Sequence, residues 1–332
     1  MPSVHGSEFS SSILKTLREI CREPPAFGGP APVRANPIYW RKMIPFIRFG
    51  WLTIPTFGLM VACAMIGAYF VLRAEIARRG ITSGSAAAEA EMFIAIPCVA
   101  GIVGAKFYHL LQSPRELFAD PLGLIFSGYG FAWFGGLLAG FAAFVWLARH
   151  RKVPLVDILD AGSPAAALGY GIGRIGCLLS GDGDYGIPTS LPWGMSFPNG
   201  LVPTSERVHP TPVYELIVAC MIAWCLWRLG TRQIAGRNLA QAGPTAPARK
   251  ERAARGLPTR AGGLARGGVF AAYLVLTGVA RFLVEFIRIN PRSFFGMSNA
   301  QAASVVSVIA GALLWQRLKR TSGAQASPIT RQ

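Results

Sequence analysis

Charged residues are scarce in this sequence. Only 15% of its 332 residues are Asp, Glu, Lys or Arg, whereas 52% are hydrophobic, and the mean hydropathy is +0.39. A soluble chain of this length would be expected to divide into two or more domains. Here the apolar residues gather into runs of about 20, the length that a helix needs to cross ~30 Å of hydrocarbon. The composition therefore predicts an all-α, polytopic integral membrane protein.

Cysteine pairs of the kind that bind metals are absent as well. None of the six cysteines forms a C-x-x-C pair, and most of them fall within apolar runs, where a cysteine ordinarily packs as a small hydrophobic residue. We therefore expect neither a zinc site nor a disulfide framework, and no metal or cofactor. The first 50 residues lack a short apolar core followed by small residues, so no cleavable signal peptide is expected.

Acidic residues are few in comparison with basic ones. The chain has 16 Asp and Glu against 33 Lys and Arg, a net charge of +17. A basic balance of this size can indicate nucleic-acid binding. The arginines, however, cluster just beyond the ends of the apolar runs, and the longest basic stretch has no interleaved aromatic residues. This placement favours membrane orientation and argues against a nucleic-acid partner.

Seven apolar segments have the length of transmembrane helices. They are residues 51–72, 92–112, 122–148, 155–179, 210–228, 268–287 and 300–316. Lys and Arg follow the first, third, fifth and seventh segments, so the positive-inside rule predicts an extracytoplasmic N-terminus and a cytoplasmic C-terminus. The remaining parts are predicted as a polar, basic arm (1–50), a small extracytoplasmic head (180–209), a disordered cytoplasmic loop (229–267) and a cytoplasmic tail (317–332).

The densest polar cluster within apolar sequence runs from Gly171 to Gly186. An arginine at bilayer depth is costly, so Arg174 either marks a functional site or pairs with an acidic residue of another helix. Arg174 precedes Cys177 by about one helical turn, which permits contact between the two side chains. Cys177 is then either a packing residue or a nucleophile activated by Arg174. Asp182 follows at the point where the chain should leave the membrane.

A second cluster spans Arg281 to Arg288. Arg281 and Glu285 are four residues apart on one helical face, and Arg288 lies about a turn further along. The first two residues form either an internal salt bridge only or, together with Arg174, part of a site for a lipid phosphate. The second interpretation draws on the guanidinium group, which binds phosphate bidentately.

A third cluster opens the fifth segment with His209, Tyr214 and Glu215. Two prolines beside them suit the first turn of a helix. His209 and Tyr214 fit a capping and interface-anchoring role as well as a catalytic one. His109, at the end of the second segment, is expected to anchor the chain at the membrane interface.

Taken in order, these clusters resemble the prolipoprotein diacylglyceryl transferase family of bacterial membrane enzymes. The matching stretches begin at Thr56-Phe-Gly-Leu-Met60, include Gly173-Arg-Ile-Gly176, and end with Arg281–Arg288. The family has seven spans with an extracytoplasmic N-terminus. Its members transfer diacylglyceryl from phosphatidylglycerol to the lipobox cysteine of a preprolipoprotein and release glycerol phosphate. The resemblance thus implies a multi-pass enzyme of the bacterial inner membrane.

The resemblance also implies roles for single residues. Arg174 and Arg281 would bind the lipid phosphate, Glu285 would position Arg281, and Asp182 takes the place of an acidic residue in the family signature. The expected catalytic residues are Arg174, Arg281, Glu285 and His209, and the expected substrate-binding residues are Arg174, Gly176, Cys177, Asp182, Gly186, Tyr214, Glu215 and Arg288. The implied partners are phosphatidylglycerol, preprolipoprotein signal peptides and membrane lipid, and we expect a monomer.

Several polar positions of the family pattern are altered in this chain. They are Phe57 and Thr277 in place of tyrosines, Phe134 in place of a histidine, and Cys177 in place of an asparagine. Because phenylalanine cannot move a proton, two interpretations remain. Either His109 or His209 takes the proton of the incoming thiol, or the chain is a divergent paralogue with another acceptor or no catalysis. A transporter is disfavoured, since the sequence shows no internal repeat.

Overall fold

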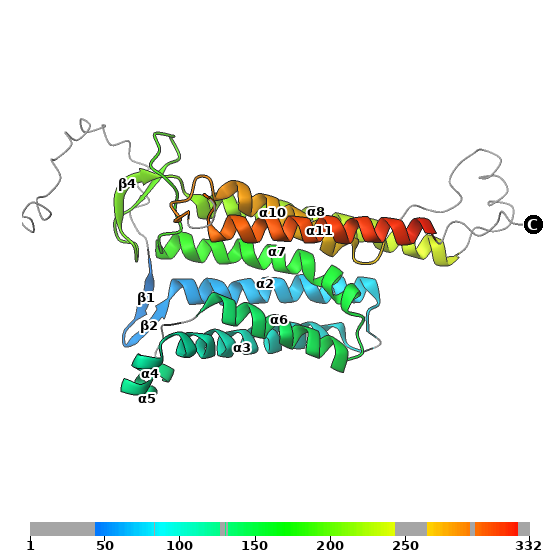
Figure 1. Cartoon of the computed structure of the whole chain (residues 1–332), viewed down its shortest axis with the longest axis horizontal. Coiled ribbons are helices and arrows are strands. Elements are labelled where there is room, and N and C mark those ends of the chain that lie inside the picture. Colours follow the sequence, from blue (N-terminus) through cyan, green and yellow to red (C-terminus); the bar gives the residue numbers. More distant parts are fainter. Residues whose placement is uncertain are drawn as a thin grey trace, which may run out of the picture. The chain divides into compact units, whose positions relative to one another are not determined.

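The computed structural model describes residues 44–82, 84–126, 130, 132–242, 264–292 and 296–324. Within these ranges the chain is mostly helical, with two small two-stranded sheets, in agreement with the predicted helical class (Figure 1). Most of the predicted arm, the 243–263 part of the predicted loop and residues 325–332 of the predicted tail lie outside the described residues.

Seven long helices make up most of the described chain. They are α2 (Thr56–Arg79), α3 (Ala86–Gln112), α6 (Trp133–His150), α7 (Leu155–Ser180), α8 (Thr211–Ala242), α10 (Gly268–Val284) and α11 (Asn299–Ala324). The short helices α4 (Pro114–Ala119) and α5 (Pro121–Phe126) lie between α3 and α6. Each of the seven predicted segments therefore falls on one long helix.

Among the described residues, three helical stretches have both the length and the apolar composition needed to cross a membrane: Thr56–Arg79, Ala86–Gln112 and Thr211–Asn238. Phe134–His150 and Gly268–Val284 are apolar but shorter. Because helices satisfy their own backbone hydrogen bonds, such segments can enter hydrocarbon without exposing unpaired polar groups. The described residues thus form a helical membrane protein.

The first predicted segment begins with a strand instead of a helix. β2 (Leu52–Pro55) pairs antiparallel with β1 (Phe46–Phe49), and α2 starts only at Thr56. Next to β1, Ile44 N donates a hydrogen bond of 3.2 Å to Leu179 O near the end of α7. The hairpin is therefore attached to the end of α7, and the predicted start of this helix at 51 is corrected to 56.

The third predicted segment, 122–148, is interrupted between α5 and α6. Gly130 has a φ of +76°, and a Cβ atom at this position would lie only 2.3 Å from Nε2 of His109. A left-handed turn against a neighbouring ring leaves room for glycine alone. The continuous helix therefore begins after this turn, at Trp133, and the predicted start at 122 is corrected accordingly.

The long helices pack in neighbouring pairs: α2 along α7, α3 along α6, α7 along α8, and α10 along α11 (Figure 1). The closest approach of α3 and α6 depends on glycine. A Cβ atom on Gly135 would lie 2.4 Å from the carbonyl oxygen of Gly104, and one on Gly104 would lie 2.7 Å from that of Gly135. Small residues of this kind let helix backbones approach within membranes. α7 contacts both α2 and α8, so its polar residues can meet partners from several helices.

α8 continues past residue 228 into the segment predicted as a disordered loop. The contacts of Gln233 explain why the helix continues. Its side chain is buried, its Nε2 donates to Asp160 Oδ2 at 2.8 Å, and its Oε1 accepts from Arg79 Nη1 at 2.6 Å. Asp160 Oδ2 also accepts from Gly267 N at 2.8 Å, at the start of α10. These contacts tie α2, α7, α8 and α10 together, and the predicted boundary at 229 is corrected to 242.

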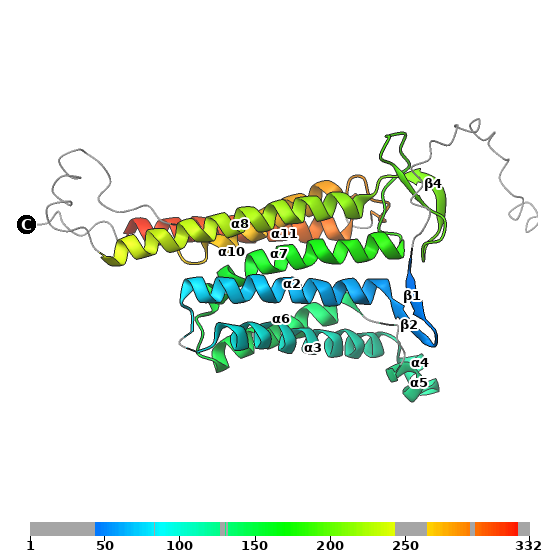
Figure 2. The same cartoon turned by 180° about the vertical axis from the view of Figure 1, so that it is seen from behind.

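The head lies between α7 and α8 and contains β3 (Met195–Phe197) paired antiparallel with β4 (Thr204–Val208) (Figure 2). Its core is small, with the rings of Tyr185 and Phe197 stacked 5.1 Å apart. Backbone contacts join the head to the turn after α10, where Ile187 N donates to Ile287 O at 2.8 Å. Segments that follow α7 and α10 are thereby held side by side.

The buried contacts of Asp160 allow a test of how the bundle is stabilised. Asp160→Ala would leave buried donors without their acceptor, so we expect the free energy of unfolding to fall by about 3 kcal/mol. Asp157→Ala is the matched control in the same helix. Its partner Arg266 has a side chain that is 56% exposed, and loss of such a pair costs about 1 kcal/mol or less. Thermal unfolding in detergent measures both variants, and equal losses would contradict the assignment.

Candidate active site

Three arginines and three carboxylates meet where α7, α8, the head and the turn after α10 come together. They are Arg174 of α7, Asp184 of the head loop, Glu215 of α8, Arg281 of α10, and Glu285 and Arg288 of the following turn. The residues come from distant parts of the chain, and the contacts between the head and the turn after α10 bring them into one network.

Glu215 lies at the centre of this network. Its side chain is 4% exposed, and its Oε2 lies 3.2 Å from Arg174 Nε and 3.4 Å from Arg288 Nη1. Its Oε1 lies 3.3 Å from Arg281 Nη1 and accepts a hydrogen bond of 2.7 Å from the hydroxyl of Tyr170. One buried carboxylate therefore contacts all three guanidinium groups. This pairing offsets the cost of burying the charges.

Asp184 bridges two of the same arginines. Its Oδ2 pairs with Arg174 Nη1 and its Oδ1 pairs with Arg288 Nη2. Burial favours the neutral form of the Asp184 carboxyl, but the charges of Arg288 and Arg174 outweigh this effect and hold its pKa below the usual range. With a side chain that is 29% exposed, Asp184 is also the most exposed of the three carboxylates.

Glu285 pairs with Arg281 and also bonds to Asn290. Its Oε2 lies 2.9 Å from Arg281 Nη2, and its Oε1 accepts a hydrogen bond of 2.6 Å from Asn290 Nδ2. The ion pair at i and i+4 that the sequence offered is therefore formed. Because the Glu285 side chain is 1% exposed, this pair orients Arg281 with little competition from water.

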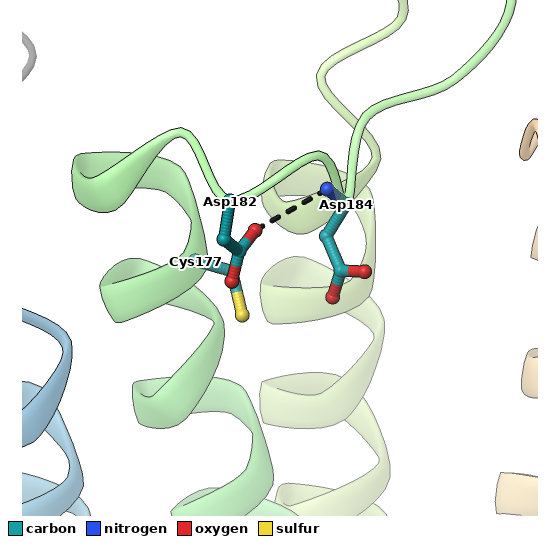
Figure 3. A group of neighbouring side chains, drawn as sticks. All are labelled: Cys177, Asp182 and Asp184. Carbon is teal, nitrogen blue, oxygen red and sulfur yellow. Dashed lines mark hydrogen bonds between the residues drawn. The ribbon is translucent and has the colours of Figure 1, made fainter. Parts of the chain in front are cut away.

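Figure 3 shows Cys177 in the last turns of α7, with Asp182 and Asp184 in the loop that follows. Cys177 Sγ lies 3.5 Å from Arg174 Nη1, and Asp182 Oδ1 accepts a hydrogen bond of 3.2 Å from Asp184 N. The thiol and the two carboxylates offer ligand atoms within 4.8 Å of one another. Asp184 is already paired with two arginines, whose charge disfavours a metal cation at this place.

Asp182 and Asp184 lie two residues apart but have different contacts. The resemblance assigned the acidic position of the signature to Asp182, whereas Asp184 is the aspartate that pairs with Arg174 and Arg288. Burial, and then the neighbouring charge of Asp184, raise the pKa of the Asp182 carboxyl. The sequence reasoning also missed Tyr170, although its i, i+4 spacing to Arg174 was a usable signal.

The expected histidines occupy different places. Nδ1 of His209 lies 3.2 Å from the hydroxyl oxygen of Tyr214, which accepts a further hydrogen bond of 2.8 Å from Trp193 Nε1. This group is at the start of α8, next to Thr211, whose hydroxyl donates to the carbonyl oxygen of Asp184. His109, by contrast, lies at the end of α3 against the turn that precedes α6.

The two glycines among the expected site residues serve close packing. A Cβ atom on Gly186 would lie 2.5 Å from the carbonyl oxygen of Ile287, where the head joins the turn after α10. One on Gly176 would lie 3.1 Å from Cβ of Met60 and 3.2 Å from the ring of Phe57. Gly186 therefore permits the contact that assembles the network, and Gly176 permits the contact of α7 with α2.

The residues at the other altered positions lie on helix surfaces. Phe134 is 60% exposed on α6, and Phe57 is 44% exposed in the first turn of α2. Thr277 donates its hydroxyl to the carbonyl oxygen of Tyr273, one turn back in α10, at 2.6 Å. At these positions the chain has apolar side chains or, at Thr277, a hydroxyl that bonds to its own helix.

Comparison with known proteins identifies related sequences over most of the chain. The sequence model of a family described as prolipoprotein diacylglyceryl transferase matches residues 45–243 and 253–317. The phosphatidylglycerol–prolipoprotein diacylglyceryl transferase of Geobacter sulfurreducens is 32% identical over 249 residues, which cover 73% of this chain and 81% of that protein. The protein of the same name from Clostridium tetani is 28% identical over 275 residues, covering 81% of this chain and 95% of that protein.

The opposite pKa shifts of the two aspartates predict opposite effects of pH. The stability that Asp184 contributes is complete above the pKa of the unfolded carboxyl, about 3.9, and is lost as the pH falls through the lower folded value. Asp184→Asn should therefore lower the melting temperature at pH 7, and its melting temperature should approach that of the wild type below about pH 4.

Asp182 has a raised folded pKa, so its charge lowers the stability as the pH rises. Asp182→Asn should raise the melting temperature at pH 7, and identical pH profiles of the two variants would contradict the assignment.

Proposed function

The chain belongs to the prolipoprotein diacylglyceryl transferase family, and we propose that it transfers the diacylglyceryl group of phosphatidylglycerol to the lipobox cysteine of a preprolipoprotein. The observation that carries this proposal is the network of three arginines within the matched residues, with Arg174, Arg281 and Arg288 held around Glu215. The names of the relatives specify both the lipid donor and the protein acceptor.

The reaction is a displacement at a carbon of the lipid glycerol. The acceptor sulfur forms a C–S bond, the C–O bond to the phosphate breaks, and glycerol phosphate leaves while the thiol gives up its proton. Negative charge grows on the departing phosphate oxygen in the transition state. Guanidinium groups fixed in advance stabilise such a charge without reorganisation. Arg174 and Arg281, with side chains 14% and 26% exposed, would supply this stabilisation.

His209 is the better of the two histidines as the base that takes the thiol proton. It lies at the start of α8, on the side of the network where Thr211 contacts Asp184, whereas His109 belongs to the end of α3. The hydroxyl of Tyr214, next to Nδ1 of His209, can orient the ring. Since a thiol near a cationic group ionises easily, one such base is sufficient.

We further propose a placement in the membrane. All seven long helices would cross the bacterial inner membrane, with the N-terminus and the head outside and the C-terminus in the cytoplasm. The coincidence of each predicted segment with one long helix supports this topology. The site would then lie at the extracytoplasmic interface, where a signal peptide presents its cysteine. We also propose that the site is complete in a monomer, because the charged groups of the network pair with one another within the chain.

A second candidate function is phospholipid binding without turnover. It is favoured by Phe134, which replaces the family histidine and cannot transfer a proton. In this case the arginine network would bind an anionic headgroup, and the protein would modify a different acceptor or none.

The transfer assay separates these functions. Purified protein is incubated with phosphatidylglycerol and a lipobox peptide, and the thioether product is measured by mass spectrometry. We expect product from the wild type, and a rate lower by about 10²–10³-fold for Arg174→Gln, because a donor to the developing charge is lost. Arg232→Gln, an exposed position on α8, is the control and should retain the wild-type rate. Lipid binding by the wild type without product would support the second candidate instead.

The choice between the histidines has its own test. His209→Gln should lower the transfer rate by about 10²–10⁴-fold and remove the acidic limb of the pH–rate profile, as expected for loss of a general base. His109→Gln should leave both the rate and the profile unchanged. The reverse pattern would assign the proton transfer to His109.

A further inference from the structure

The positive and negative charges of the network are equal in number, and this affects how it can bind an anion. Three guanidinium groups face three carboxylates, so the assembled site offers little net positive charge to an incoming phosphate. An anion can gain the full electrostatic attraction of these arginines only if one carboxylate moves away from them. The three carboxylates differ in how readily they can do so.

Glu215 and Glu285 are enclosed by the protein. Their side chains are 4% and 1% exposed, and each has partners from more than one direction. The Asp184 side chain is 29% exposed and belongs to a loop. Its backbone is fixed, since Thr211 donates to its carbonyl oxygen and Asp182 accepts from its N–H. A rotation of the side chain alone would therefore free the arginines and leave the loop in place.

The contacts of Asp184 resemble those that a phosphodiester would make. Each of its two carboxylate oxygens pairs with a different guanidinium, one on Arg174 and the other on Arg288. The two charged oxygens of a phosphodiester can take the same places. Arg288 also has an unfilled donor, because its buried Nε lies 3.8 Å from Glu285 Oε2 and makes no hydrogen bond among the described residues. Its side chain is only 6% exposed, which makes an unfilled donor costly.

We propose that Arg174 and Arg288 form an anion-binding position that Asp184 occupies in the free protein, and that the phosphate of an anionic lipid headgroup displaces Asp184 from it. The identity of the ligand rests on the proposed function. Asp184 thereby sets the selectivity of the site, since a zwitterionic headgroup, whose phosphate is offset by its own cation, competes poorly with a carboxylate. The apparent affinity for the lipid equals the intrinsic affinity multiplied by the fraction of molecules in which Asp184 has moved away.

Neutral variants of Asp184 test this exchange. Asp184→Asn keeps the shape of the side chain and removes the competing charge, so binding of phosphatidylglycerol in phosphatidylcholine nanodiscs should become about tenfold tighter. Asp184→Ser should show the same gain, and Asp184→Glu, which keeps the charge, should show none. Glu206→Gln, at an exposed carboxylate on β4 of the head, is the control and should bind as the wild type does. Native mass spectrometry of the nanodiscs measures the bound lipid.

The contribution of Arg288 is tested in the same background. Asp184→Asn combined with Arg288→Gln should lose the tenfold gain. The proposal is overturned if neither folded neutral variant binds more tightly, if the gain persists without Arg288, or if both neutral variants fail to fold, which would make Asp184 a structural residue. Soluble glycerol 1-phosphate, titrated by calorimetry, distinguishes the source of the phosphate. A gain limited to this compound would overturn the assignment to a lipid.

The transfer assay on the same preparations keeps the two proposals apart. A gain in lipid binding without any thioether product from the wild type would leave the anion position in place and contradict the proposed function. Product from the wild type without a gain in the neutral variants would contradict the anion position alone.

Discussion

The ion pairs of Glu215 are the interaction on which the site depends. A carboxylate that is 4% exposed contacts three arginines, and no member of this group could remain charged in a medium of low polarity without the others. The requirement for mutual compensation links α7, α8 and α10, because each contributes a charged residue. It also explains why the head must reach the turn after α10, since this contact brings Arg288 and Asp184 to the same place.

A second group of buried polar side chains lies toward the start of α7. Its members also compensate one another, but they are less exposed to solvent. Asp160 and Gln233 there are enclosed with Arg79, and their contacts join three helices and the first turn of α10. No carboxylate of that group has the exposure of Asp184, which is 29%. The two ends of α7 thus use similar chemistry, but the carboxylate beside the head is much more exposed than Asp160.

The ionic network and the altered positions Phe57 and Phe134 differ in their structural surroundings. The arginines and their glutamates form one closed network, so a change in any of them disturbs all the others. Phe57 and Phe134 are instead 44% and 60% exposed on separate helices, where a substitution leaves the network intact. An acid–base group, such as the proposed base His209 just before α8, can therefore change position more easily than the anion-binding group can.

The sequence by itself determined the helical membrane class, the approximate positions of the long helices and the family, because hydropathy and the spacing of Arg174, Arg281 and Glu285 are local properties that a linear pattern contains. Helix boundaries depended on contacts across the fold, as at Gly130 beside His109. Only the tertiary structure decided which aspartate joins the arginines. Asp182 and Asp184 are two residues apart in the same loop, and the direction of each side chain depends on the packing of the head against α8 and the turn after α10.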